Sequence, residues 1–258
     1  MTDRIRLDGR IALVTGAAGV IGTETMRLLA ARGACIVAVD RDAEGLKRAV
    51  TGLPAHAEAM AVVADVTREE DVAGYVRLAL GKFSRIDVFF NNAGIEGDIV
   101  PIVDASVENF RRVLEVNVVG VFLGMKHVLP TMLKQNSGSI INTASIAGRI
   151  GSADIAAYSA SKHAVIGLTK TAALECSGTN VRVNCVCPGM IDSRMLSAIV
   201  VGRSRGEPVP PEKVHDRVPA RRLGLAAEVA PIVAFLASDD ASYVSGSAYT
   251  VDGGRTAS

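Results

Sequence analysis

The chain lacks an excess of charge of either sign. It has 28 Lys and Arg against 27 Asp and Glu over 258 residues, a formal net charge of +1. A protein that attracts nucleic acid or anionic lipid through a broad basic surface needs a positive field that this balance does not provide. We therefore expect no nucleic acid and no membrane among its partners, and we expect a small-molecule ligand instead.

Long apolar runs are also missing. Apolar residues make up 49% of the chain, but Gly, Asp, Arg and Lys interrupt them before any run approaches the length of a membrane span, roughly 18 residues. The first residues, MTDRIRLDGR, lack the apolar core of a secretory signal. These absences predict a cytoplasmic location.

Metal-binding and disulfide patterns are absent as well. The four cysteines, Cys35, Cys176, Cys185 and Cys187, are more typical of small buried hydrophobes in a cytosolic chain. Cys185 and Cys187 would share one face of a strand, yet no His or Cys pair at zinc spacing accompanies them. The four histidines are scattered without a partner at metal spacing, so we expect no metal.

What the chain does have is a regular alternation of short β-branched or apolar runs with longer segments of helical period. This is the signature of repeated βαβ units. The strand candidates are 11–15, 35–40, 59–64, 87–91, 138–143, 181–186 and 248–251, and helices are expected near 22–32, 42–50, 68–80, 106–134, 157–177 and 226–237. Because the strand runs are apolar on both faces, we predict an α/β fold: a single doubly wound Rossmann-type domain over residues 1–258, with a seven-stranded parallel sheet between two helical layers.

One stretch breaks this rhythm. Residues 192–220 are rich in Arg, Gly and Pro and are too long for an ordinary connection. The stretch is either a substrate lid over a site or a surface insertion, and we favour the lid because functional loops dominate this length class.

A glycine-rich loop separates the first predicted strand from the first helix. Gly16, Gly19 and Gly22 would let the backbone approach a pyrophosphate, and the free N–H groups of the helix N-terminus add partial positive charge. The alternative is a turn that merely needs positive φ.

The next strand ends in Asp40, 18 residues after Gly22. A carboxylate at that point accepts hydrogen bonds from both ribose hydroxyls and repels a 2′-phosphate, which favours NAD over NADP. Arg41 follows it and keeps NADP open, since an arginine can pair with a 2′-phosphate. Asp40 can also be interpreted as a cap for the helix expected near Ala43.

Tyr158 and Lys162 lie four residues apart on a predicted helix and so share one face. We hypothesise that the lysine charge lowers the pKa of the phenol, so that the tyrosine serves as acid and base. Ser145 follows a predicted strand at the sheet edge where ligands bind, and its hydroxyl is suited to hold a substrate oxygen. Taken singly, Tyr-x-x-x-Lys more often marks a helix surface and a serine after a strand is often a helix cap.

Together these motifs resemble the classical short-chain dehydrogenase/reductase family. They are TGAAGVIG, NNAG at 91–94, Asn117, Ser145, YSASK at 158–162, PG at 188–189 and the terminal VDGG, in the family's order across nearly the whole chain. One departure is that Val20 occupies the position of the family's middle glycine, with glycine at Gly19 instead.

The resemblance implies an NAD(H)-dependent oxidoreductase that transfers a hydride between nicotinamide and a secondary alcohol or ketone. It implies that Ser145 orients the substrate oxygen, Tyr158 transfers the proton, Lys162 binds ribose and biases the tyrosine, and Asn117 anchors a water in a proton relay. The positions implied to contact the cofactor are Gly16, Gly19, Ile21, Gly22, Asp40, Arg41, Asp65, Val66, Asn92, Ala93, Gly94, Tyr158, Lys162, Pro188, Gly189, Ile191 and Ser193.

Substrate contacts are expected from the loops near the site. Arg149 and Asp154, between Ser145 and Tyr158, are the better candidates, and Glu96 and Asp98 are weaker ones. The wide apolar faces of 106–134 and 157–177 indicate burial against another subunit, and the resemblance implies a homotetramer.

Two rival functions remain. A non-catalytic dinucleotide-binding sensor or scaffold would not need Asn117, Ser145, Tyr158 and Lys162 together. An epimerase or dehydratase that shares the Tyr-x-x-x-Lys pair is disfavoured, because such enzymes carry a larger carboxyl-terminal substrate region than this chain has room for.

Overall fold

The computed structural model describes residues 5–257, so residues 1–4 and 258 of the predicted domain lie outside the described residues. The described chain forms one sheet whose strands run in parallel. The strands are β1 (Ile11–Thr15), β2 (Cys35–Asp40), β3 (Ala59–Val63), β4 (Val88–Asn91), β5 (Gly138–Thr143), β6 (Val181–Pro188) and β7 (Ala248–Val251).

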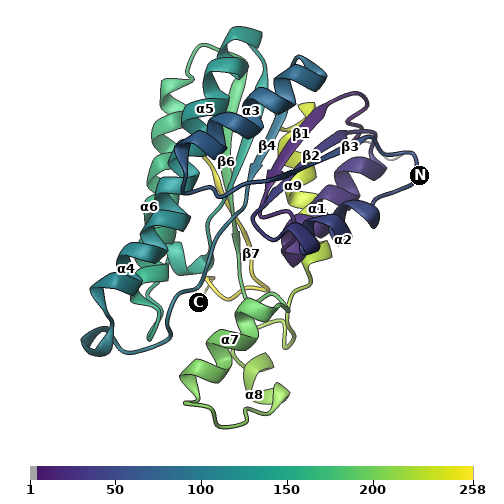
Figure 1. The fold of residues 1–258 in the computed structure, drawn as a ribbon. Helices are drawn as coiled ribbons and strands as arrows, with labels where there is room; N and C mark the ends of the chain where they lie inside the picture. Colours follow the sequence, from purple (N-terminus) through teal and green to yellow (C-terminus); the bar gives the residue numbers. More distant parts are fainter. Residues whose placement is uncertain (1–4, 258) are drawn as a thin grey trace.

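The seven strands follow the order β3-β2-β1-β4-β5-β6-β7. The chain steps outward from β1 to β3 and then returns to the other side of β1 with β4, so the order reverses between β1 and β4 (Figure 1). In open parallel sheets, ligands bind at the carboxyl ends of the strands at such a reversal. The predicted doubly wound fold is confirmed.

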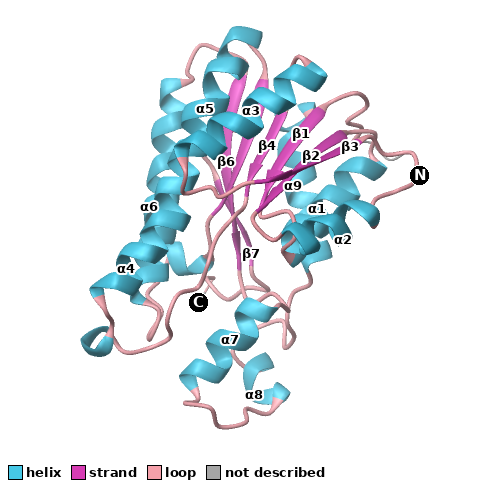
Figure 2. Cartoon of the chain, viewed as in Figure 1, coloured by secondary structure: helices cyan, strands magenta, loops and turns pink. Residues whose placement is uncertain are grey.

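Helices cover both faces of the sheet (Figure 2). α3 (Glu69–Phe83), α5 (Gly120–Gln135) and α6 (Ala156–Glu175) pack on one face, and α1 (Val20–Ala31), α2 (Ala43–Thr51) and α9 (Ala226–Ala237) pack on the other.

Alternate residues of one strand serve the two cores. In β1, Leu13 belongs to the cluster with α3 and α5, whereas Ala12 and Val14 belong to the cluster with α1 and α9. All five β1 residues are buried, which explains why the strand sequences are apolar on both faces.

Two sequence expectations need correction. The helix predicted over 106–134 is divided into α4 (Val107–Leu114), a π-helical turn η2 (Glu115–Val119) and α5. The stretch 192–220, to which no helix was assigned, contains α7 (Arg194–Arg203) and the short α8 (Pro211–His215). These two helices project below the carboxyl ends of the strands (Figure 1).

The run of helix from Val107 to Gln135 also passes a length and hydropathy test for a membrane span, with a mean hydropathy of 1.4 over its best window. The expectation from the sequence concerns uninterrupted apolar runs, whereas this helix is apolar only when its hydropathy is averaged over a window. Within the fold, 44% of that window is buried, and Val121, Met125, Val128 and Met132 of α5 belong to the core beneath the sheet. The segment is a core helix of the described domain.

Candidate active site

A cavity of about 860 Å³ opens at the carboxyl ends of the strands. The loops after β1, β2, β4, β5 and β6 all contribute to its wall. Of the residues predicted to form the site, those that line it are Gly16, Gly19, Ile21, Asp40, Arg41, Asp65, Val66, Asn92, Ala93, Gly94, Ser145, Tyr158, Lys162, Pro188, Gly189, Ile191 and Ser193. Gly22 and Asn117 are not part of the wall.

The glycine loop crosses close to the loop after β4. Gly16 has a φ of +64°, and a Cβ there would lie 2.9 Å from the Cα of Ala93. A Cβ on Gly22 would collide with the carbonyl oxygen of Gly16, so this glycine lets α1 turn back onto the loop. Gly19 has an ordinary negative φ and is the N-cap of α1, which starts at Val20 and has no acidic residue in its first turn.

The loop therefore leaves the amino end of α1 facing the cavity wall without a neutralising carboxylate. Backbone N–H groups at a helix N-terminus carry partial positive charge and bind anions. The close contacts at Gly16 and Gly22 exceed what a simple turn requires, because a Cβ at either position would meet neighbouring backbone. Val20, in place of the family's middle glycine, is 45% exposed and is accommodated in the first helical turn.

Asp40 lies at the end of β2, next to this loop. Its Oδ2 accepts from the backbone N–H of Ala18 at 2.9 Å, and its Oδ1 accepts from that of Asp42 at 3.0 Å. The carboxylate is thereby fixed in the cavity wall with further lone pairs on both oxygens. The cap of α2 is Asp42, which accepts from the N–H of Gly45, so Asp40 is not the helix cap.

Thr15 and Asn92 tie the loops after β1, β4 and β5 together. The Thr15 hydroxyl accepts from the backbone N–H groups of Asn92 and Ala93 at 3.0 and 3.2 Å. The Asn92 amide donates to the carbonyls of Thr15 and Gly16, and its oxygen accepts from the hydroxyl of Thr143. Sequence reasoning missed Thr15 and Thr143, although both stand beside residues of recognised motifs.

Tyr158 and Ser145 face each other across the other half of the cavity. Tyr158 is in the first turn of α6 and is 9% exposed. Ser145 follows β5, and its hydroxyl accepts from the N–H of Ala147 at 3.1 Å, so it caps a short helical turn as well as facing the phenol. Both the capping interpretation and the site interpretation of this serine therefore apply.

Lys162 lies one turn after Tyr158 on the same face of α6. Its Nζ donates to the carbonyl oxygen of Thr143 at 2.7 Å and is 5.6 Å from the centre of the Tyr158 ring. The side chain is buried, with 3% exposure. The predicted trio of hydroxyl, phenol and ammonium is thus brought together from the end of β5 and the start of α6.

The pKa values of this pair differ from the sequence hypothesis. Burial raises the pKa of Tyr158 to about 12, only partly opposed by its hydrogen bond with Ser145. Burial also lowers the pKa of Lys162 to about 8. The expectation that the lysine brings the phenol's pKa toward neutrality is not met in the protein alone, because desolvation of the phenolate outweighs a charge that is itself disfavoured by burial.

Asn117 lies behind the cavity wall, in the π-helical turn η2. Its Oδ1 accepts from the N–H of Ile95 at 2.8 Å, and its Nδ2 donates to the carbonyl of Ile95 at 2.9 Å and to the hydroxyl of Ser161 at 3.0 Å. The side chain is fully buried. Asn117 thus joins the loop after β4 to α6 immediately beside Lys162, and π-turns are often found at such functional positions.

The segment 192–220 forms the outer wall through α7. Arg194 makes a two-pronged ion pair with Glu96, at 2.8 and 3.2 Å, which fastens the start of α7 to the loop after β4. Glu96 is 8% exposed. Asp98 does not line the cavity and pairs with Arg112 at the surface. Arg149 and Asp154, predicted to contact substrate, do not line the cavity either.

Three comparisons place these features among known proteins. A family model described as enoyl-(acyl carrier protein) reductase matches residues 16–256. Levodione reductase of Leifsonia aquatica is 40% identical over 98% of this chain and 96% of its own length. Cyclohexanol dehydrogenase of Acinetobacter sp. (strain SE19) is 40% identical over 97% of this chain and 96% of its own length.

Solved structures agree with the sequence relatives. The crystal structure of NAD⁺-bound xylitol dehydrogenase superimposes with a TM-score of 0.90 at 39% identity, over 96% of this chain and 99% of that one. The chain thus shares its fold with a solved dehydrogenase and about two fifths of its sequence with named oxidoreductases. The chain belongs to the short-chain dehydrogenase/reductase family of oxidoreductases.

Proposed function

We propose that the protein is an NAD(H)-dependent oxidoreductase that interconverts a secondary alcohol and a ketone, with Tyr158 as the group that transfers the proton. One observation carries this proposal. The Tyr158 phenol, the Ser145 hydroxyl and the Lys162 ammonium meet on the wall of a cavity whose other end is a phosphate-binding glycine loop. A sensor or scaffold would need the loop but not the trio.

The residues present fit a dinucleotide. Gly16 and Gly22 are positions at which a Cβ would obstruct the loop, and the amino end of α1 faces the space they leave. When bound there, nicotinamide supplies or accepts the hydride. Lys162, Asn92 to Gly94 and Pro188 to Ser193 are the groups that would hold the nicotinamide end.

Asp40 favours NAD over NADP in this proposal. Its fixed carboxylate suits the two donor hydroxyls of an adenosine ribose and would repel a 2′-phosphate. Burial raises the pKa of Asp65, but hydrogen bonds from Thr67 and the charges of Arg41 and Arg68 outweigh it and hold that pKa below its usual value. The charge of Arg41 already acts on the Asp65 carboxylate, so Arg41 is less available to pair with a 2′-phosphate, which weakens the case for NADP.

The chemistry of the protein's own groups follows from their positions. Ser145 donates a hydrogen bond to the substrate oxygen and stabilises the negative charge that develops there in ketone reduction. The Tyr158 phenol, protonated at neutral pH, gives its proton to that oxygen, and in alcohol oxidation the phenolate takes the proton back. Lys162 stabilises the phenolate when it forms. Asn117 holds the loop after β4 against α6, next to Tyr158 and Lys162, and it also anchors a water in a proton relay.

Two further features belong to this proposal. Segment 192–220 acts as a substrate lid, because α7 closes one side of the cavity and is fastened to a neighbouring loop. The protein is a homotetramer, because α4, α5 and α6 leave large apolar side chains exposed, among them Phe110, Phe122 and Leu174. A molar mass in solution equal to that of one chain would contradict the tetramer.

The function is tested by a screen of secondary alcohols and ketones followed by NADH absorbance. Tyr158→Phe should lower turnover by about 10³-fold while NADH still binds with nearly the wild-type affinity. Tyr243→Phe is the matched control, since that side chain is fully exposed. Turnover that survives in Tyr158→Phe would refute the assigned role, and NADH binding without turnover of any compound in the wild type would favour the sensor.

A further inference from the structure

The two ends of the cavity differ in their charged side chains, although Arg41 accompanies the carboxylates at one of them. The acidic side chains in its wall, within the described residues, are Asp40, Asp42 and Asp65, all at the end where the nucleotide loop lies. The far end is lined by the lid, where one face of α7 presents Leu196, Ile199, Val200 and then Arg203. Arg217, which follows α8, lines the same end, and Arg255 reaches it from the carboxyl-terminal segment.

Arg203 is held in place by neutral groups. Its Nη2 donates to the hydroxyl of Ser152 and to the carbonyl of Ala153, both at 2.7 Å. Its Nε is buried without a hydrogen-bond partner, and within residues 5–257 no carboxylate lies within ion-pair distance of the guanidinium. The side chain is therefore oriented by neutral groups, and its charge has no ion-pair partner among the described residues, although Asp154 offsets part of it.

Arg217 lines the same end of the cavity and is exposed. No side-chain hydrogen bond or ion pair of Arg217 is formed with the described part of the chain. Burial lowers the pKa of Arg203 and the charge of Arg217 lowers it further, while the charge of Asp154 partly opposes both. Solvent screens the repulsion between the two guanidinium groups, and an anion between them would relieve what remains.

Neighbouring arginines show the contrast. Arg194 pairs with Glu96 at 2.8 Å, Arg221 pairs with Asp216, and Arg222 pairs with Glu228 at 2.6 Å. Arg194 begins the lid, and Arg221 and Arg222 lie just beyond it. Unlike these three, Arg203 and Arg217 line the far end of the cavity with no carboxylate at ion-pair distance among the described residues.

The distance along the lid suits a compact substrate. Seven residues separate Leu196 from Arg203, a rise of about 10 Å along a helix, and helical side chains lean toward the N-terminus. Met195 and Ile155 pack beside Tyr158, so the wall between the phenol and the guanidinium groups is largely apolar. A hydrocarbon ring or a short chain fits this interval.

Resting on the proposed function, we propose that Arg203 and Arg217 bind a carboxylate of the substrate. The substrate class is then a hydroxy acid or keto acid in which an apolar ring or short chain separates the reacting carbon from the carboxylate. A guanidinium matches the planar carboxylate through two parallel hydrogen bonds. The anion also removes the repulsion between the two arginines.

The test compares one acid with its neutral isostere. kcat/KM is measured with 4-hydroxycyclohexanecarboxylate and with 4-hydroxycyclohexanecarboxamide for wild type, Arg217→Gln and Lys213→Gln. The wild type should prefer the acid, and Arg217→Gln should lower kcat/KM for the acid by about 10- to 100-fold, mainly through KM, while the amide changes less than about twofold. Lys213→Gln removes a charge from an exposed lid position outside the cavity and should change neither.

Arg203→Gln serves as a second variant because it also loosens the contact with Ser152. Its effect is measured as the ratio of kcat/KM for the acid to kcat/KM for the amide. This ratio should fall even if both values of kcat/KM decrease. An equal loss for acid and amide in both variants, or a wild type without preference for the acid, overturns the proposal. A loss of NADH affinity in Arg217→Gln with an unchanged ratio would also overturn it and assign these charges to the phosphates of the cofactor.

A binding measurement separates this proposal from the proposed function. In the NADH-saturated protein, cyclohexanecarboxylate should raise the melting temperature more than cyclohexanecarboxamide, and Arg217→Gln should abolish the difference. A larger rise with cyclohexanesulfonate than with the carboxylate would overturn the carboxylate assignment in favour of a sulfonate. Failure of all alcohol oxidation with this binding intact would overturn the proposed function alone, whereas oxidation of neutral alcohols without the binding difference would overturn the anion site alone.

Discussion

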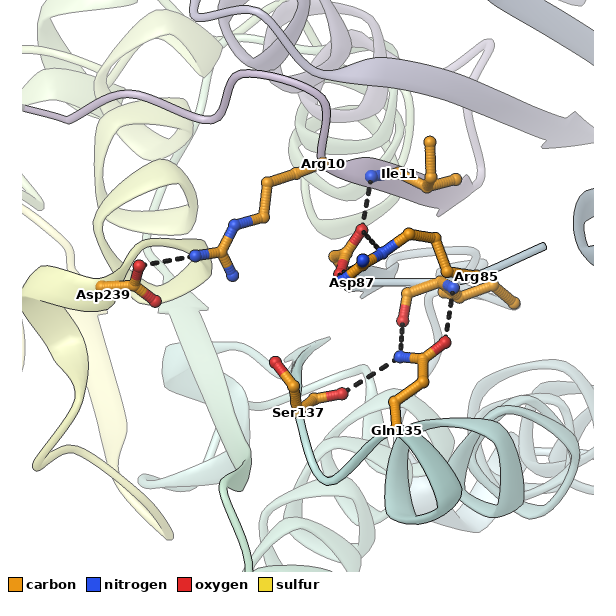
Figure 3. Close-up of polar contacts among 8 residues, drawn as sticks. Arg10, Ile11, Arg85, Asp87, Gln135, Ser137 and Asp239 are labelled. Atoms are coloured by element: carbon orange, nitrogen blue, oxygen red, sulfur yellow. Dashed lines mark hydrogen bonds and ion pairs between the residues drawn. The ribbon is translucent and has the colours of Figure 1, made fainter. Parts of the chain in front are cut away.

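Buried polar groups are hydrogen-bonded differently at the two ends of the strands of the same sheet. At the amino edge, where β1 and β4 begin, the Asp87 carboxylate is 1% exposed and accepts from the backbone of Ile11 and from the Arg85 guanidinium (Figure 3). Gln135 completes the edge by pairing with both the N–H and the carbonyl of Ile86. Each of these groups is satisfied by the chain itself.

At the carboxyl edge, buried polar groups keep hydrogen-bond donors that the chain itself does not use. Lys162 has one hydrogen bond, to Thr143, although an ammonium can donate three. Arg203 is half-buried, and its Nε is buried without a hydrogen-bond partner. The comparison teaches that buried polar groups at the amino edge stabilise the fold. At the carboxyl edge they lower the stability of the protein but remain available to bind a ligand.

The sharpest test of this comparison is Lys162→Met. Turnover should fall by about 10³-fold because the phenolate loses its stabilising charge, yet the folded protein should become more stable at pH 7, by about 1 to 2 kcal/mol, because a desolvated charge is removed. Chemical denaturation and the NADH assay measure the two effects. A less stable variant would contradict the view that this edge carries a stability cost.

The same variant has a pH signature. The pKa of Lys162 is lowered from 10.5 to about 8 by burial, so the unfolded chain binds more protons between about pH 8 and 10.5. Wild-type stability should therefore rise with pH through that window, and the cost of burying the charge is fully present below pH 8. The stability gain of Lys162→Met should shrink over the same interval.

Asp87→Ala is the converse experiment at the amino edge. Removing the buried carboxylate should lower the free energy of unfolding by about 1 to 3 kcal/mol, since the Ile11 N–H loses its acceptor while Arg85, which is half exposed, can be solvated instead. Activity per folded molecule should stay within about twofold of wild type, because the residue is far from the cavity wall. Asp239→Ala, which breaks only an exposed pair with Arg10, is the control and should cost less than about 1 kcal/mol.

Asp40→Ala should have a smaller effect, on selectivity. The ratio of kcat/KM for NAD to that for NADP should fall by about tenfold, equivalent to about 1.4 kcal/mol, because the repulsion of a 2′-phosphate is lost. Steady-state kinetics with both cofactors provide the measurement. A wild type that already prefers NADP by tenfold would refute the interpretation of this carboxylate.

Tyr75→Phe should give the smallest change. The Tyr75 hydroxyl is buried in the core on α3 without a hydrogen-bond partner, and burial raises its pKa well above the usual value. Removing it should stabilise the fold by about 1 kcal/mol without changing activity. A thermal melt detects this, and a destabilised variant would indicate that the hydroxyl has an acceptor after all.

The sequence predicts the sheet well because each strand is a short apolar run bounded by turn residues. The ends differ by one or two residues, as at β6, which continues to Pro188. α7 and α8 escaped prediction because the stretch that contains them is rich in Arg, Gly and Pro after residue 202, which hid the helical spacing of Leu196, Ile199 and Val200. Tertiary contacts such as that of Arg203 with Ser152 also support them. Local periodicity contains no information on contacts of that kind.

The site shows the same division. Motif residues such as Tyr158 and Lys162 were predictable because they share one helical face, and their joint position with Ser145 follows from the order of the strands. The pKa of Tyr158 was not predictable from the sequence, because the burial that raises it depends on the packing of distant segments. The partnership of Glu96 with Arg194 spans 98 residues and has no signal in the sequence.

The π-turn at Glu115–Val119 has a consequence for how the chain can vary in length. This turn holds one residue more than an α-helical turn would, so the extra residue is taken up while α4 and α5 continue in nearly one helical phase. Deleting a single residue there would restore a continuous α-helix and leave the sheet-facing side chains of α5 in register, but it would remove the widened turn in which Asn117 lies. The chain can therefore lose a residue here without losing the fold, and the cost would fall on the contacts of Asn117 with Ile95 and Ser161.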